Sequence, residues 1–302
     1  MGSDVAIGTR VEPRAGREAG PVRTLTLMGQ RMDAVTASEV IALMLGARAG
    51  GRTILIANHN LHSLALVRTS AAMQAFYARA DVVEIDSTPL IHLARLLGHE
   101  VGAEHRCTYL DWREAFFEQA AARGITLAYV GGAPGVAERA AELLMARWPG
   151  VRIIARDGYF DADPASGDTA AIVRWLGEHQ PDVLMVGMGM PRQENWIAGV
   201  IAQLPPMAVL SVGAAFDYEA GVQKAAPRWM GRAGLEWLYR LVHDPVRLAR
   251  RYMIEPWLLL PELHHALSHE AVSQRHAALR AVLAAMLWLP ARAARLLRPQ
   301  SR

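Results

Sequence analysis

Short apolar runs alternate with segments of helical periodicity along most of this chain. The apolar runs are Leu25–Met28, Thr53–Ala57, Val82–Ile85, Thr126–Val130, Val151–Ile154, Val183–Val186 and Ala208–Val212. The helical segments between them include Ala37–Leu45, Thr88–Leu97, Trp112–Ala122, Val136–Arg147 and Thr169–His179. Because buried parallel strands are almost continuously apolar, this alternation predicts an α/β fold. We expect a Rossmann-like, mostly parallel sheet with helices on both faces.

The pattern changes near residue 222. Beyond Pro227 the periodicity is helical throughout, with breaks at further prolines. Residues 1–23 show neither pattern and lack the apolar core of a secretory signal. We therefore predict a disordered leader over 1–23, an α/β domain over 24–222 and a helical, basic appendage over 223–302.

Composition and charge indicate what kind of molecule or surface this protein binds. The chain has 302 residues, and its single cysteine, Cys107, excludes an internal disulfide. No run supplies the ~18 uncharged apolar residues of a spanning helix. From Arg240 to the C-terminus there are ten arginines against four acids, a net charge of +6. Interleaved Trp, Leu and Tyr make this basic end typical of binding to an anionic membrane surface, and not to nucleic acid.

The densest candidate chemistry lies in residues 181–221. One predicted strand ends in Gly187 and Gly189, and a predicted helix then begins with Pro191, Gln193 and Glu194 in its first turn. The next strand leads in the same way to Asp217. Ligands of open parallel sheets bind at the carboxyl ends of the strands, and free N–H groups at a helix start favour phosphate. We expect a ligand pocket here.

Two further strand ends carry candidate side chains. Asn58 suits a sugar hydroxyl or a uracil edge, because an amide both donates and accepts; alternatively, Asn58 or Asn60 caps the next helix. Asp86 could be the general base that deprotonates an acceptor hydroxyl. The alternative for Asp86 is also a helix N-cap.

A loop and a turn are weaker candidates. Arg106 could bind a diphosphate, with Asp111 as a substrate contact, or Arg106 could be a surface residue while Asp111 caps a helix starting at Trp112. Gly131 and Gly132 form a turn that lets a phosphate approach the backbone, or simply a tight turn.

Arginines dominate the start of the helical appendage. The candidates for binding a lipid diphosphate or the membrane are Arg228, Arg232, Arg240, Arg247, Arg250 and Arg251. Helical spacing could align Arg240, Arg247 and Arg251 on one face, although Pro245 interrupts it. Residues 281–290, followed by Arg292, Arg295 and Arg298, could form an amphipathic anchor.

Several ordered motifs resemble one known family. PDVLMVGMGMPRQENWI, SVGAAFDYEAG, APRWMGRAGLEWLYRL and DPVRLARRY resemble the WecG/TagA/CpsF glycosyltransferases, glycosyltransferase family 26, over roughly residues 24–255. The resemblance implies a bacterial, inverting enzyme that transfers a hexosyl or N-acetylhexosaminyl group from a UDP-sugar to a polyprenyl-diphosphate-linked sugar. It would work in polysaccharide synthesis, whether exopolysaccharide, capsule or teichoic-acid type, as a peripheral protein on the cytoplasmic face of the inner membrane.

The resemblance also bears on individual residues. It implies that Asp86 is the catalytic base, that Asn58 contacts substrate and that the C-terminal arginines reach a diphosphate. Two positions depart from the family pattern: Ile56 stands where threonine is usual, and Ser87 where glycine is usual. A non-catalytic module that binds a nucleotide-sugar or a lipid diphosphate therefore stays open, as does a homo-oligomer.

We expect no metal cofactor. Arginines could neutralise the leaving diphosphate in place of a metal ion. Asp161 and Asp163 resemble the acidic pair of metal-dependent sugar transferases, but their context is a polar loop where scattered aspartates are common.

Overall fold

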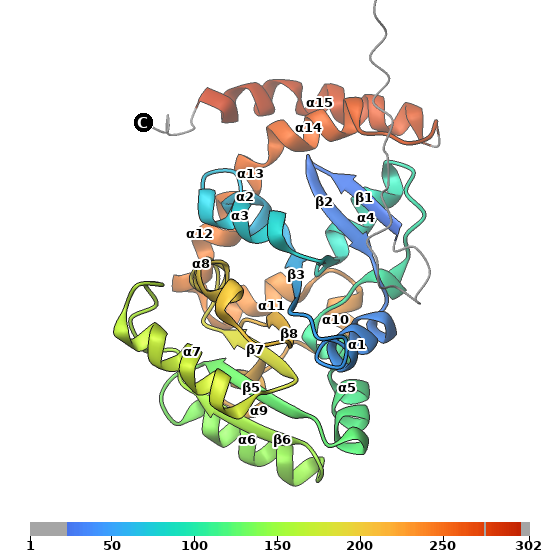
Figure 1. The fold of residues 1–302 in the computed structure, drawn as a ribbon. Helices are drawn as coiled ribbons and strands as arrows, with labels where there is room; N and C mark the ends of the chain where they lie inside the picture. The colour runs from blue at the N-terminus through green and yellow to red at the C-terminus, as the bar shows by residue number, and fades with distance from the viewer. Residues whose placement is uncertain (1–22, 275, 297–302) are drawn as a thin grey trace, which may run out of the picture.

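A single parallel sheet forms the centre of the protein (Figure 1). The computed structural model describes residues 23–274 and 276–296; the predicted leader therefore lies almost wholly outside the described residues. The spatial order of the strands is β4 (Val82–Ile85), β3 (Ile54–His59), β8 (Ala208–Ser211), β7 (Val183–Gly187), β5 (Thr126–Gly131) and β6 (Arg152–Arg156). All five pairings in this sheet are parallel, as the apolar runs predicted.

Helices cover both faces of the sheet, which confirms the predicted fold class. One face carries α1 (Ala37–Gly46), α5 (Tyr109–Arg123), α6 (Val136–Arg147) and α9 (Ala215–Glu219). The other carries α3 (Ala71–Arg79), α7 (Gly167–His179) and α8 (Arg192–Val200). Because successive strand residues point to opposite faces, Val183 and Met185 pack in the first layer, whereas Leu184 and Val186 pack in the second.

The first predicted strand lies outside this sheet. It pairs as β1 (Arg23–Leu27) with β2 (Gln30–Ala34) in an antiparallel hairpin, whose turn has Met28 and Gly29 at positive φ. Two other short helices, α2 (Leu61–Leu66) and α4 (Thr88–Leu96), follow β3 and β4, and η1 (Ala103–His105) precedes α5. A second 3-10 turn, η2 (Ile201–Gln203), follows α8.

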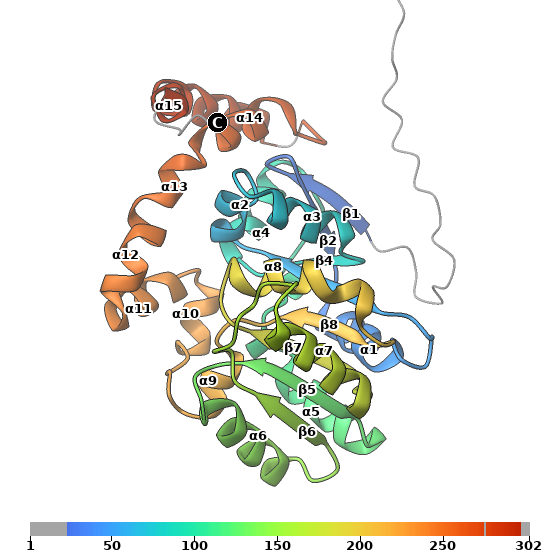
Figure 2. The same ribbon diagram turned by 60° about the vertical axis from the view of Figure 1, so that its left-hand side comes forward.

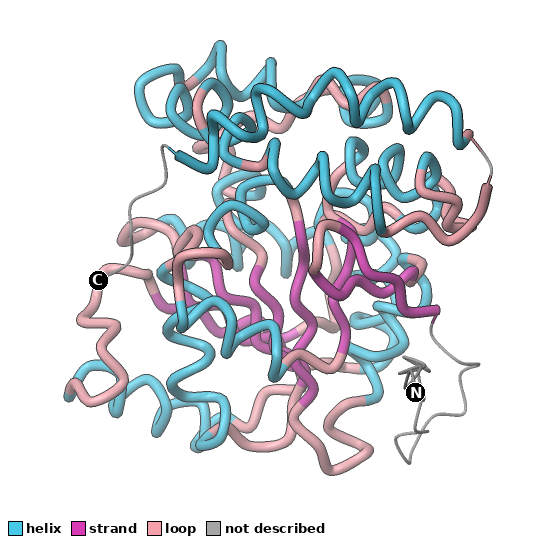
Figure 3. Tube along the Cα trace, turned by 90° about the horizontal axis from the view of Figure 1, so that it is seen from above, coloured by secondary structure: helices cyan, strands magenta, loops and turns pink. Residues whose placement is uncertain are grey.

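Beyond residue 227 the described chain is helical, as predicted. Helices α10 (Arg228–Arg232), α11 (Glu236–His243), α12 (Pro245–Met253) and α13 (Glu255–Leu258) run along one side of the molecule (Figure 2). They lead to α14 (Leu260–His269) and α15 (Ala277–Leu296), which lie side by side across the end that carries the hairpin (Figure 3).

This helical segment packs against the α/β domain. Leu259 and Leu267 pack in one apolar cluster with Leu25 of β1 and Leu90 of α4. The carboxylate of Glu270 accepts hydrogen bonds from the N–H groups of the hairpin turn, at 2.7 and 2.8 Å. Removing the segment would expose this cluster, so its role is better tested by point substitutions than by truncation.

Candidate active site

The carboxyl ends of four strands, β3, β4, β7 and β8, meet beneath α11 and α12. Two adjoining cavities occur here, of about 310 and 160 Å³. The residues that line both cavities are Asn60, Asp86, Thr108, Glu236, Arg240 and Arg251. Asp86 thus lies where the two cavities meet.

The smaller cavity is lined by the stretch that the sequence singled out. The N–H of Gly189 donates to Oε1 of Gln193 at 3.1 Å, so the side chain of Gln193 holds the turn after β7. The Nε2 of Gln193 donates to Glu194 at 2.7 Å. From β3, the Nδ2 of Asn58 donates to the carbonyl of Ser211 at 2.8 Å. Glycine backbone, amides and a hydroxyl therefore face this cavity.

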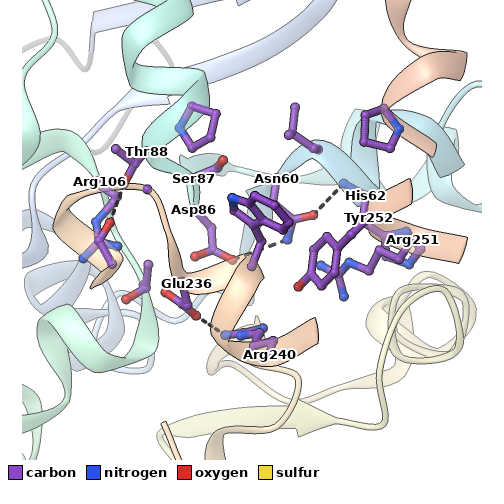
Figure 4. Close-up of a pocket in the computed structure, with 17 residues that line it drawn as sticks. Asn60, His62, Asp86, Ser87, Thr88, Arg106, Glu236, Arg240, Arg251 and Tyr252 are labelled. Carbon is purple, nitrogen blue, oxygen red and sulfur yellow. Dashed lines mark hydrogen bonds and ion pairs between the residues drawn. The ribbon is translucent and has the colours of Figure 1, made fainter. Parts of the chain in front are cut away.

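The larger cavity lies between the sheet and the C-terminal helices, and Figure 4 shows it with Asp86 beside Asn60 and Glu236. Its lining is more apolar: it includes Leu61, Pro89, Trp237, Tyr252 and Pro256. The hydroxyl of Thr88 donates to the carbonyl of Gly231 at 2.8 Å, which ties α4 to α10 across this cavity. Aromatic and apolar walls with a few polar groups suit a sugar on an apolar carrier.

Hydrogen bonds position Asp86, and burial and neighbouring charges set the pKa of its carboxyl group. Its N–H donates to the carbonyl of His59 at 2.9 Å, and its Oδ2 accepts from Nδ2 of Asn60 at 3.4 Å. Burial raises the pKa of Asp86 to about 7, and the carboxylate of Glu236 adds to this, whereas Arg240 opposes it. A carboxylate with a pKa near the working pH is well suited to general base catalysis.

Asp86 is not a helix cap. The N-cap of α4 is Ser87, whose side chain makes no capping hydrogen bond. Asn60 does cap α2, accepting from the N–H groups of His62 and Ser63. Asn58 caps nothing and lines the smaller cavity. Of the alternatives for these strand ends, the helix cap holds for Asn60 alone.

Three arginines converge on the cavities, although not on one helix. Pro245 starts a new helix, so Arg240 lies on α11 while Arg247 and Arg251 lie on α12; the predicted single face was wrong. All three nevertheless line the smaller cavity. Arg240 pairs with Glu236 and Arg247 with Asp244.

Arg251 differs from the other two arginines. Burial lowers the pKa of its guanidinium, and its buried Nε has no hydrogen-bond partner. It is therefore the arginine best prepared to bind an anion in these cavities. Its neighbour Arg250 is exposed and lines neither cavity.

Arg106 and Asp111 form a pair at 2.8 Å, but only Arg106 lines the larger cavity. Asp111 belongs to the capping box of α5: it accepts from the N–H of Thr108 at 3.2 Å and also pairs with Arg228. The helix begins at Tyr109 and not at Trp112, because Thr108 is its N-cap. Asp111 orients Arg106, and a direct substrate contact for it stays a prediction.

The remaining predicted residues line neither cavity. They are Gly131, Gly132, Gly187, Pro191, Glu194, Asp217, Arg228 and Arg250, and the side chain of Arg232 lies outside what the structure describes. Gly131 and Gly187 serve packing, because a Cβ on Gly131 would lie 2.3 Å from the carbonyl of Gly187. Pro191 is the N-cap of α8 and not its first helical residue. Binding roles for these residues stay predictions.

Glu236 is the residue that sequence reasoning missed. It lies in APRWMGRAGLEWLYRL, one of the motifs that carry the family resemblance. Helical periodicity could not indicate that it faces Asp86, since that depends on where α11 packs.

The two aspartates that resemble an acidic metal-binding pair form hydrogen bonds within their own loop. The N–H of Asp163 donates to Asp161 at 3.0 Å, and that of Ala165 donates to Asp163 at 2.8 Å. Among residues 23–274 and 276–296 no cluster of three or more potential ligands occurs. Metal-independent catalysis stays a prediction. Within the same described residues, no helix is both long and apolar enough to cross a bilayer.

Comparison with known proteins identifies the family. The model of the glycosyl transferase WecG/TagA/CpsF family matches residues 25–272. Two relatives come from Staphylococcus aureus, strains MW2 and NCTC 8325 / PS 47, and both are named N-acetylglucosaminyldiphosphoundecaprenol N-acetyl-beta-D-mannosaminyltransferase. Each is 24% identical to this chain over 204 residues, which covers 68% of this chain and 78% of the relative.

Proposed function

Because the chain belongs to the WecG/TagA/CpsF glycosyltransferase family, we propose that it transfers a sugar from a UDP-sugar to a polyprenyl-diphosphate-linked sugar. The observation that carries the proposal is the position of Asp86 between two cavities of different character. The donor occupies the smaller, polar cavity and the acceptor sugar occupies the larger one.

The reaction is a single displacement with inversion. Asp86 takes the proton of the acceptor hydroxyl as that oxygen bonds to the anomeric carbon. The bond from this carbon to the β-phosphate oxygen breaks, and UDP leaves with the electron pair. Arg240, Arg247 and Arg251 stabilise the charge that develops on the diphosphate.

The relatives support one class of donor sugar. Their names specify an N-acetylhexosaminyl group and an undecaprenol-linked acceptor. An N-acetylhexosaminyl donor is therefore the first to test, and hexosyl donors are the alternative. The apolar walls of the larger cavity are compatible with a lipid-linked acceptor.

The deciding experiment combines a panel of UDP-sugars with a short-chain polyprenyl-diphosphate sugar. We expect one donor to give UDP release that depends on the acceptor, and this release should persist in EDTA. Binding of a UDP-sugar without acceptor-dependent release would instead identify a non-catalytic binding module. Loss of release in EDTA with recovery in Mn²⁺ would overturn metal-independent catalysis.

Gln193 should act in donor binding. Gln193→Ala removes the side chain that holds Gly189, so we expect donor affinity to fall about tenfold, the loss of one or two buried hydrogen bonds. Calorimetry with UDP measures this effect. Asn195→Ala is the matched control, because it is an exposed amide on the same helix that lines neither cavity. Equal affinities of the two variants would make Gln193 a purely structural residue.

We also propose that the C-terminal helices hold the protein on the cytoplasmic leaflet. Of the large apolar side chains described as exposed, only Leu143, Tyr159 and Val222 precede residue 223. Trp229 and Trp257 are 62% and 63% exposed and line neither cavity. Such aromatics next to arginines suit the boundary between water and lipid.

Replacing Trp229 and Trp257 with serine should therefore lower binding to anionic liposomes several-fold, as measured by co-sedimentation. High salt should release the wild-type protein, because each arginine contributes about 1 kcal/mol through screened attraction. Tyr159→Ser is the control, since Tyr159 is 75% exposed on the loop after β6. If the double variant bound liposomes as well as the control, the exposed tryptophans would have no role at the membrane.

A further inference from the structure

A second buried carboxyl group lies two residues before Asp86 on the chain. Glu84 is on β4, and Asp86 directly follows the last residue of that strand. The side chain of Glu84 is 4% exposed, and its Oε1 has no hydrogen-bond partner among the described residues. A buried carboxyl oxygen without a partner is costly, so its presence beside a catalytic group calls for a function.

A small cavity joins the two carboxyl groups. Its volume is about 50 Å³ and both Glu84 and Asp86 line it. Its other lining residues with polar groups are Asn58, Cys107, Thr108, Tyr109, Trp112 and Ser211. A cavity of this size with several polar partners meets the conditions for an ordered water.

The groups around Glu84 favour its neutral form. No arginine, lysine or histidine forms an ion pair with Glu84 in the described part of the chain. The titratable groups that face it are Cys107 and Tyr109, which line the same cavity, and the carboxyl groups of Asp86 and Asp111. Burial, followed by the two aspartates, raises the pKa of Glu84 well above its usual value. A buried carboxyl group that no cation pairs with is most stable in its neutral form, which can donate a hydrogen bond.

The groups around Asp86 leave room for such a donor. Glu236 and Arg240 face it from α11, Arg106 faces it from the loop before α5, and Arg251 from α12. The hydrogen bond that Asn60 donates to it is long, at 3.4 Å. A further donor would stabilise the ionised carboxylate and fix its orientation.

We propose that Glu84 is a positioning residue for Asp86 and donates a hydrogen bond to its carboxylate through a water in the small cavity. No covalent bond changes in this step; the proton stays on Glu84. The proposal rests on the role of Asp86 as general base. Its consequence is that Glu84 keeps Asp86 ionised in surroundings that would otherwise protonate it.

Two variants test whether Glu84 acts as a hydrogen-bond donor or as a negative charge. Glu84→Met removes the donor at similar length, so we expect the pKa of Asp86 to rise by about one unit. Glu84→Gln keeps an N–H donor and should leave that pKa within about 0.3 units of the wild type. The readouts are the pH dependence of kcat/KM and the 13Cγ shift of Asp86, assigned with Asp86→Asn. At pH values below the pKa of Asp86, kcat/KM of Glu84→Met should be about tenfold lower than that of the wild type.

Three results would overturn the proposal. If both variants lowered the pKa of Asp86, Glu84 would be an ionised, repelling neighbour. If neither changed it, Glu84 would only fill space. If the 13Cδ shift of Glu84 in the wild-type protein showed ionisation at pH 7, the donor would not exist, and this measurement needs no variant to fold.

The failure of the proposed function would look different. No UDP-sugar would then give acceptor-dependent UDP release, while the 13Cγ shift of Asp86 could still respond to Glu84→Met. The two ideas can therefore fail separately.

Discussion

Asp86→Asn is expected to lower kcat about 10²-fold or more while leaving the affinity for UDP largely intact. The substitution keeps the shape of the side chain and removes its basicity. Because Asp86 lines both cavities, no other described carboxylate except Glu236 is placed to take over the proton. Glu236 is paired with Arg240 and is therefore a poorer base. Initial rates with the identified donor and calorimetry with UDP measure the two quantities.

The pH dependence gives an independent check on the same residue. Asp86 accepts a proton only when it is ionised, and its pKa is raised to about 7. The wild-type rate should therefore rise as the pH passes through about 7, and this limb should vanish in Asp86→Asn. Asp161→Asn is the matched control, since Asp161 lines neither cavity. Near-normal turnover of Asp86→Asn would eliminate Asp86 as the base.

Arg251→Met is expected to lower kcat/KM about 10²- to 10³-fold, the usual cost of removing one preorganised donor to developing charge. Arg251 lines both cavities, and its buried Nε forms no hydrogen bond with the described residues, so it is free to bind substrate. Methionine keeps most of the length and the apolar contact with the neighbouring ring of Tyr252, which lies 5.6 Å from the guanidinium carbon. Steady-state kinetics with donor and acceptor varied separately measures the loss.

Arg250→Met is a close control for this prediction. It makes the same change one residue earlier on α12, at an exposed position outside both cavities. We expect a change of less than about twofold, as for most surface substitutions. Equal activity of the two variants would mean that Arg240 and Arg247 suffice to hold the diphosphate, and that Arg251 is not needed for it.

Much of the sheet could be predicted because a strand that is buried on both faces requires a local run of apolar residues. Val183–Val186 and Ala208–Leu210 are continuously apolar, since each of these strands is buried on both faces. Asp86 and Asn58 could be selected for a related reason: each lies at the end of such a run, and the ends of parallel strands meet at one edge. The hairpin position of Leu25–Met28 could not be predicted, because an apolar run does not specify its partner.

The sequence by itself determined the order of strands and helices along the chain, the chemistry at the strand ends and the basic character of the C-terminal helices. Only the tertiary structure decided which side chains reach the cavities. Arg251 lines them and Arg250 does not, although both are arginines on one helix. Glu236 lies near Asp86 because α11 packs over the carboxyl ends of the strands, and Glu84 lies near it because both line one small cavity at the end of β4. Periodicity reports whether a residue is buried, but the identity of its neighbours depends on contacts between segments more than a hundred residues apart, and those contacts leave no periodic signal in the chain.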